Sequence, residues 1–282
     1  MNWLQKLFGW NRETPLWENS ERDEKIPRDD RTLLALYGAL RTISKTRLSQ
    51  DICLRGSLPL FYWLPGLARI PGDLDFVLPS TWTGDAVKNV LDSAKRHTSR
   101  EKLPIEMDWE RMMNAPIWTY SDTPGVRFQL PYQLDRHSSS SLQLDFSFHD
   151  LNPTDTRDSE IVIAEWPNSF RLKIVRPEFA LACKLAWLAH DKNWQTKDVY
   201  DVCIMVEYLR IDGRVLRSTL ARHNDVPDAE AIKIDELIKL FQTGKAVPQG
   251  VTALTTRKGI RQVNLKELAI GIAPKLQALL VE

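Results

Sequence analysis

The fold of this chain is decided by Arg55-Gly56-Ser57 and by Asp73-Leu74-Asp75-Phe76, which begins sixteen residues after Ser57. Alternate residues of a β-strand project to the same face, about 6.6 Å apart, so Asp73 and Asp75 share a face of the expected strand. The Gly-Ser pair precedes the apolar segment Leu58–Leu64, which we expect to form a helix. Backbone N–H groups exposed at such a turn favour a phosphate. The pattern therefore predicts paired carboxylates beside a phosphate-binding turn.

A third acid lies in a second apolar stretch, Leu142-Gln143-Leu144-Asp145-Phe146. Asp is disfavoured in strands, and burying a carboxylate is costly unless it is paired or binds a metal. Three acids on neighbouring strands would make a cup of oxygen ligands for one or two Mg²⁺ or Mn²⁺ ions, together with substrate phosphates. We therefore predict that Asp73, Asp75 and Asp145 are metal ligands. The alternative is that acids at strand ends are simply hydrated.

The composition is that of an ordinary globular protein, with 43% hydrophobic and 27% charged residues. A net charge of +1 gives no global attraction to nucleic acid, so any RNA contact needs a local basic patch. No apolar run approaches the ~20 residues of a membrane span, and no signal peptide is evident. The cysteines Cys53, Cys183 and Cys203 lie in apolar surroundings without metal-binding spacing. They indicate reduced core thiols and a cytoplasmic protein.

The order of elements predicts an α+β fold in three parts. Residues 1–31 read as an N-terminal segment and charged linker, with an apolar decapeptide expected to dock on the body, a partner or a membrane surface. Residues 32–176 form the core, where alternating patterns over 105–175 predict strands and the serines 138–141 a polar turn. Residues 177–282 are expected to be helical to the end.

The order and spacing of these motifs resemble the AbiEii/AbiGii-type nucleotidyltransferase toxins, within the superfamily that includes DNA polymerase β. That family shows a Gly-Gly or Gly-Ser turn followed by Arg-x-Ser-x-Asp-Leu-Asp-Phe. Here Gly56-Ser57 and Arg69-Ile70-Pro71-Gly72-Asp73-Leu74-Asp75-Phe76 match, with Pro71 in place of the family's usual serine.

The family also carries a Pro-Glu-x-x-x-x-x-Lys-Leu helix followed by Arg/Lys-Asp-x-Tyr-Asp. The matching residues are Pro177-Glu178, Lys184-Leu185 and Lys197-Asp198-Val199-Tyr200-Asp201. The resemblance covers roughly residues 33–209. It implies a nucleotidyltransferase-type mixed β-sheet core with flanking helices and a helical C-terminal subdomain.

The resemblance also implies roles for residues of both motifs. Nucleotide binding falls to Gly56, Ser57, Arg69 and Lys184, and catalysis to Asp73, Asp75, Asp145, Lys184, Asp198 and Asp201. At least one of Asp198 and Asp201 is expected to orient Lys184 or to assist the acceptor hydroxyl. Each assignment has a purely structural alternative. Ser57 could simply cap a helix, and Arg69 could be an ordinary surface arginine. Lys184 could bury its aliphatic stem while its ammonium group reaches water.

The function that follows is Mg²⁺-dependent transfer of a nucleoside monophosphate from an NTP to an acceptor hydroxyl. The resemblance implies a toxin of a toxin–antitoxin or phage-defence system, an RNA acceptor such as a tRNA 3′ end, and a cognate antitoxin protein. A small-molecule acceptor, as in antibiotic nucleotidyltransferases, is the runner-up. A catalytically inactive module that binds nucleotide or a partner stays open. So does a nuclease, although it would not need the Gly-Ser turn.

Overall fold

The structure is a computed structural model, which describes residues 28–98, 105–117, 124–135, 138–161, 170–190, 194–224 and 232–281. The apolar decapeptide and most of the charged linker lie outside the described residues. The helix expected from residue 32 begins earlier, because α2 already starts at Arg28.

A mixed sheet of eight strands forms the core of the described part of the chain, in the order β3-β5-β6-β2-β1-β8-β7, with β4 paired to β5. The two acid-bearing strands, β2 and β6, are parallel neighbours at its centre. The strands are β1 (Cys53–Arg55), β2 (Asp73–Leu78), β3 (Glu106–Met107), β4 (Met113–Ile117), β5 (Gly125–Asp135), β6 (Ser138–Phe148), β7 (Thr156–Ile161) and β8 (Phe170–Val175). The centre of the sheet is apolar. There the rings of Phe76 and Phe146 stack with their centroids 4.9 Å apart.

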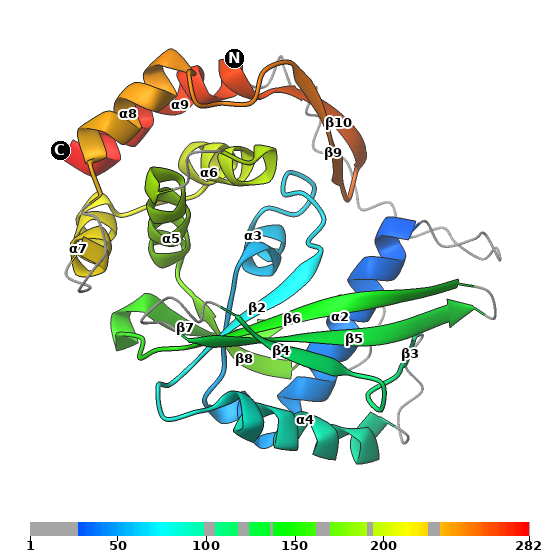
Figure 1. The fold of residues 1–282 in the computed structure, drawn as a ribbon. Coiled ribbons are helices and arrows are strands. Elements are labelled where there is room, and N and C mark those ends of the chain that lie inside the picture. Colours follow the sequence, from blue (N-terminus) through cyan, green and yellow to red (C-terminus); the bar gives the residue numbers. More distant parts are fainter. Residues whose placement is uncertain are drawn as a thin grey trace.

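Helices cover the sheet from both sides. α2 (Arg28–Ser44) packs against β6, β8 and α4 (Gly84–Thr98), and α4 runs below the sheet in Figure 1. Above the sheet lie α3 (Ser57–Trp63) and an arch of C-terminal helices (Figure 1). The arch consists of α5 (Pro177–His190), α6 (Thr196–Tyr208), α7 (Gly213–Asn224), α8 (Ile234–Thr243) and α9 (Leu265–Val281). The α+β class is thereby confirmed.

Two sequence predictions of local structure are wrong. The C-terminal part is not helical throughout, because β9 (Val251–Thr256) and β10 (Gly259–Asn264) form an antiparallel hairpin. Its signal was present in the β-branched residues of both strands and in Gly259, whose φ of 103° suits a tight turn. The serines 138–141 are not a turn either, because they pair with β5 as the first part of β6.

One hydrophobic core runs from the sheet into the arch. Tyr200 of α6 is fully buried, and its hydroxyl donates a hydrogen bond to the carbonyl of Leu67 at 2.6 Å. The boundary expected at residue 176 stays a prediction. Cys53 and Cys203 are buried thiols, as predicted, whereas Cys183 is only partly buried. None of the helices in the described part of the chain is long and apolar enough to cross a bilayer.

Candidate active site

The three predicted acids come together on the two central parallel strands. Asp75 of β2 is in register with Asp145 of β6, and Asp73 is in register with Gln143. Because register partners and residues two apart share a face, all three carboxylates project from one face of the sheet. Asp145 is buried, whereas Asp73 and Asp75 are partly exposed. This face is the one expected to hold a metal.

The Gly-Ser turn lies directly against Asp75. Gly56 follows β1 with a φ of 76°, and a Cβ atom placed on it would lie 2.0 Å from Oδ2 of Asp75. Only glycine satisfies both the left-handed backbone and the close approach of the carboxylate. Gly56 is also the N-cap of α3, so Ser57 does not cap that helix. The Ser57 hydroxyl is buried and has no hydrogen-bond partner among the described residues.

The surroundings of Asp75 shift the pKa of its carboxyl group. Burial, together with the neighbouring charges of Asp73 and Asp145, raises the pKa of Asp75 to about 6 against the opposing effects of Arg55 and Lys184. Such a carboxylate gains most from a nearby cation. Carboxylate oxygens of this kind are the hard donors that Mg²⁺ prefers.

The sequence analysis did not identify Arg127 of β5, which hydrogen-bonds to the third acid, Asp145. Its Nε and Nη2 atoms donate to Oδ1 and Oδ2 of Asp145 at 2.8 and 2.7 Å, and Gln143 Nε2 donates to Oδ2 at 3.0 Å. Within the described ranges, no three His, Cys, Asp or Glu side chains are gathered at metal-binding spacing. The alternation of Val126, Arg127 and Phe128 marked a polar face, but the pairing of β5 with β6 was not visible in sequence.

A second cluster of charged side chains lies at helices α5 and α6. Lys184 Nζ of α5 lies 2.8 Å from Asp201 Oδ2 and 3.5 Å from Asp198 Oδ1, both on α6. Arg69 Nη2 lies 3.2 Å from the same Asp201 oxygen. Burial opposes the charge of Lys184, but Asp201 and Asp198 outweigh it and hold its pKa above the ordinary value. Lys184 is thus held by two acids instead of reaching alone into water.

Two polar atoms of this group have unused hydrogen-bonding capacity. Arg69 Nε and Asp201 Oδ1 are buried and lack a partner among the described residues. Buried polar atoms without partners are uncommon in folded proteins and call for an explanation. A bound ligand with both acceptors and donors would supply one.

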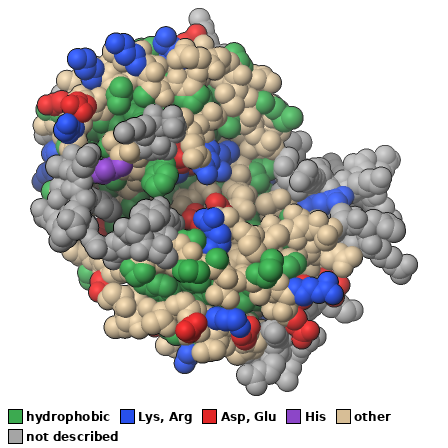
Figure 2. Space-filling model, in the orientation of Figure 1, with side chains coloured by type: hydrophobic (Ala, Val, Ile, Leu, Met, Phe, Trp, Pro, Cys, Tyr) green, Lys and Arg blue, Asp and Glu red, His purple; other side chains and the backbone are tan. Residues whose placement is uncertain are grey.

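The sheet acids and the arch group act on each other electrostatically. Lys184 lowers the pKa of Asp75, and Asp73 raises the pKa of Arg69. Figure 2 shows acidic and basic side chains gathered in a hollow between the sheet and the arch. The hairpin borders this region, because Ile70 N donates to Thr255 O at 2.9 Å and Arg69 forms a β-bridge with Thr256.

A comparison with protein families identifies the family of the chain. A model described as "Nucleotidyl transferase AbiEii toxin, Type IV TA system" matches residues 38–268. This chain belongs to the AbiEii nucleotidyltransferase toxin family. The matched range covers most of the chain and includes both charged groups and the β9–β10 hairpin, so the protein is a nucleotidyltransferase of a toxin–antitoxin family. No curated protein matches it.

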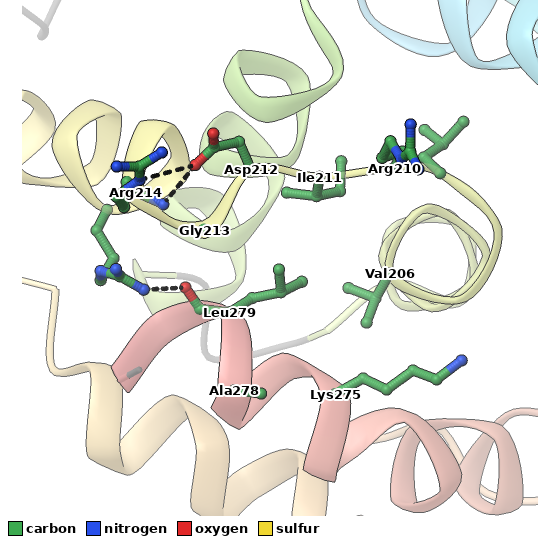
Figure 3. Close-up of a pocket in the computed structure, with 11 residues that line it drawn as sticks. Val206, Arg210, Ile211, Asp212, Gly213, Arg214, Lys275, Ala278 and Leu279 are labelled. Carbon is green, nitrogen blue, oxygen red and sulfur yellow. Dashed lines mark hydrogen bonds and ion pairs between the residues drawn. The ribbon is translucent and has the colours of Figure 1, made fainter.

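A depression of about 570 Å³ lies between the end of α6, the start of α7 and the end of α9 (Figure 3). Arg210, Arg214 and Lys275 line it, but none of the predicted site residues does. The start of α7 is already capped, because Asp212 Oδ1 accepts from Arg214 N at 2.9 Å. Because none of the predicted site residues lines it, the depression is separate from the candidate site.

Proposed function

We propose that this AbiEii family member moves a nucleoside monophosphate from an NTP to an acceptor hydroxyl with the help of Mg²⁺ or Mn²⁺. The observation that carries the proposal is the register of β2 and β6, which sets Asp75 beside Asp145 with Asp73 on the same face. Burial and the neighbouring acids raise the pKa of Asp75 to about 6, and a bound cation would favour its charged form.

The acids on the sheet would hold the metal. Bound Mg²⁺ supplies charge neutralisation at the α-phosphate and alignment of the triphosphate. Asp73 and Asp75 offer oxygens beside the Gly56 turn, and Asp145 completes the set from β6. The acceptor hydroxyl forms the new P–O bond in line as pyrophosphate leaves, which demands mainly positioning and charge stabilisation.

The turn and the arch would hold the triphosphate. Backbone N–H groups at Gly56 and Ser57 suit phosphate oxygens, and the Ser57 hydroxyl has capacity for one more hydrogen bond. Lys184 and Arg69, which share Asp201, would supply positive charge to the triphosphate. Asp201, which contacts both cations, orients them, and Asp198 assists the acceptor hydroxyl.

The acceptor that we propose is RNA, such as a tRNA 3′ end, in the cytoplasm, with a cognate antitoxin opposing the activity. Membership of a type IV toxin–antitoxin family supports the antitoxin. Exposed Arg257 and Lys258 at the turn of the β9–β10 hairpin support RNA, because they supply a local basic patch next to the Arg69 segment.

The test uses each of the four NTPs, labelled at the α-phosphate, with the protein, Mg²⁺ and total RNA. Label in RNA supports the proposal, and label in a small molecule would favour the antibiotic-type alternative. RNA fragments without transferred label would indicate a nuclease. The control is Asp73→Asn, which should lower transfer by roughly 10²–10³-fold or more while its melting temperature stays near that of the wild type.

A further inference from the structure

Asp145 is held by more donors than a resting metal ligand needs. A carboxylate offers about four lone-pair positions, two on each oxygen. Arg127 uses one on each oxygen of Asp145, and Gln143 uses the second position on Oδ2. One position on Oδ1 is left. A metal that takes more than this position must displace the guanidinium or the Gln143 amide, and one that binds both oxygens in a bidentate way competes directly with the guanidinium.

We propose that Arg127 is a substrate-positioning residue that clamps Asp145 while the site is empty and moves to the triphosphate when metal and nucleotide enter together. This inference rests on the proposed function. We call the pair of hydrogen bonds from Arg127 to Asp145 the Arg127 clamp.

The arginine is the partner that can move. The Asp145 side chain is 5% exposed on a central strand, whereas the Arg127 side chain is 38% exposed on β5. Buried Val126 and Phe128 pin the β5 backbone on either side, so the long side chain can swing without disturbing the sheet. Motion of the clamp therefore requires only a rotamer change at Arg127.

The charges around Arg127 favour its movement from the acids to the triphosphate when metal and nucleotide bind. Arg127 is in register with Asp145, which is in register with Asp75, so the guanidinium projects from the same face of the sheet as the acids. A divalent cation among the acids would repel the guanidinium at close range. The triphosphate brings new oxygens that suit the same planar fork. Metal alone therefore competes with the clamp, whereas metal with nucleotide gives Arg127 a second partner.

Such competition predicts positive coupling between the two ligands. A reciprocal coupling means that nucleotide tightens metal binding by the same factor as metal tightens nucleotide binding. Replacing Arg127 by Gln should tighten the binding of metal alone, about 5-fold or more, and should reduce the coupling factor toward one. A purely structural arginine would not produce this opposite pair of changes.

The experiment measures Mn²⁺ binding by electron paramagnetic resonance, with and without a non-hydrolysable NTP analogue. The variants are Arg127→Gln and Arg222→Gln, a matched control because Arg222 pairs with Asp155 at closely similar exposures of 39% and 4%. We expect tighter Mn²⁺ binding without analogue and weaker coupling in Arg127→Gln, and no change in Arg222→Gln. If Arg127→Gln does not fold, Arg127→Lys answers the question, because it keeps the charge but cannot bridge both oxygens.

The experiment distinguishes failure of the Arg127 clamp from failure of the proposed metal site. Unchanged or weaker Mn²⁺ binding with unchanged coupling in the folded Arg127 variant overturns the clamp. Failure of the wild type to bind Mn²⁺ even with the analogue, or full binding by Asp73→Asn, overturns the proposed metal site itself.

Discussion

At the scale of single residues, the contact between Gly56 and Asp75 determines what the turn tolerates. Two separate restrictions apply at Gly56, a φ of 76° and a carboxylate oxygen 2.0 Å from any added Cβ atom. Gly250 has the first restriction alone, because its φ is 90° but a Cβ atom added there would meet nothing within 4 Å. The two glycines therefore separate backbone strain from displacement of Asp75.

We expect Gly250→Ala to cost about 1–2 kcal/mol of stability, the usual penalty of a left-handed L-residue, with transfer unchanged. Gly56→Ala should cost at least as much and should also abolish metal-dependent NTP binding, because Asp75 must shift. Calorimetric NTP titrations with Mg²⁺ and thermal melts of both variants make the comparison. Equal NTP affinity in Gly56→Ala and wild type would show that the turn is merely structural.

The raised pKa of Asp75 predicts a pH-dependent stability in the absence of metal. Asp75 is protonated in both folded and unfolded protein below about pH 4, so its burial is harmless there. As pH rises from about 4 to about 6, the unfolded chain ionises freely while the folded protein resists the buried charge, and stability is lost. Above the folded pKa of about 6 the loss is complete. Asp75→Asn removes this loss.

In EDTA, the Asp75→Asn variant should gain roughly 1–3 kcal/mol relative to wild type between pH 4.5 and 7.5. Urea unfolding at the two pH values measures the gain. Asp158→Asn, at an exposed position on β7, is the control and should show no comparable change. A constant difference between Asp75→Asn and wild type would contradict a raised pKa at Asp75.

At the scale of elements, α5 and α6 act as a unit through Lys184 and Asp201. Asp201 is fully buried and has two cationic partners, so each helix needs the other to keep this charge satisfied. Breaking a buried ion pair by removing one partner is strongly destabilising, by about 3–5 kcal/mol when no other partner remains. Arg69 remains here and should reduce the loss.

Lys184→Met should therefore lower the melting temperature and abolish transfer, since it removes both a partner of Asp201 and a charge for the triphosphate. The double variant Lys184→Met/Asp201→Asn should recover much of the stability but none of the transfer, because the buried charge is gone. Lys184→Arg should rescue transfer only in part. Full activity in a folded Lys184→Met protein would remove the lysine from the proposed mechanism.

The elements also show what the sequence could and could not predict. β1, α3 and β2 were predictable because a buried strand, a Gly-Ser turn and paired acids are local signals. The contact of Arg127 with Asp145 was not, because it depends on which strands pair across the sheet. The β9–β10 hairpin was overlooked although Thr252, Thr255 and Val263 favour strands, because the surrounding helical periodicity dominated the interpretation.

At the scale of the whole molecule, the shared core makes the site depend on both halves of the chain. Lys184 acts electrostatically on Asp75, and Asp73 acts on Arg69, so a ligand that binds both groups should stabilise the whole fold. We expect Mg²⁺ with an NTP analogue to raise the melting temperature more than the summed effects of either alone. At 100-fold excess over Kd the gain is about 2.7 kcal/mol.

Differential scanning fluorimetry of wild type and Asp73→Asn checks this expectation. For a protein of this size each kcal/mol corresponds to about 2–4 °C. The Asp73→Asn variant should show no Mg²⁺-dependent shift. An identical shift in both proteins would mean that the cation stabilises the fold at another place.

The β-bridge between Arg69 and Thr256 can form only late in translation. Thr256 leaves the ribosome roughly two hundred residues after Arg69. At about 5–20 residues per second, this delay is on the order of 10–40 s. Until then the nascent chain has its acids and its Gly-Ser turn but lacks the strand that supports the Arg69 segment. We therefore expect a chain whose synthesis stops before Thr256 to lack this bridge and to have less transfer activity than the full chain.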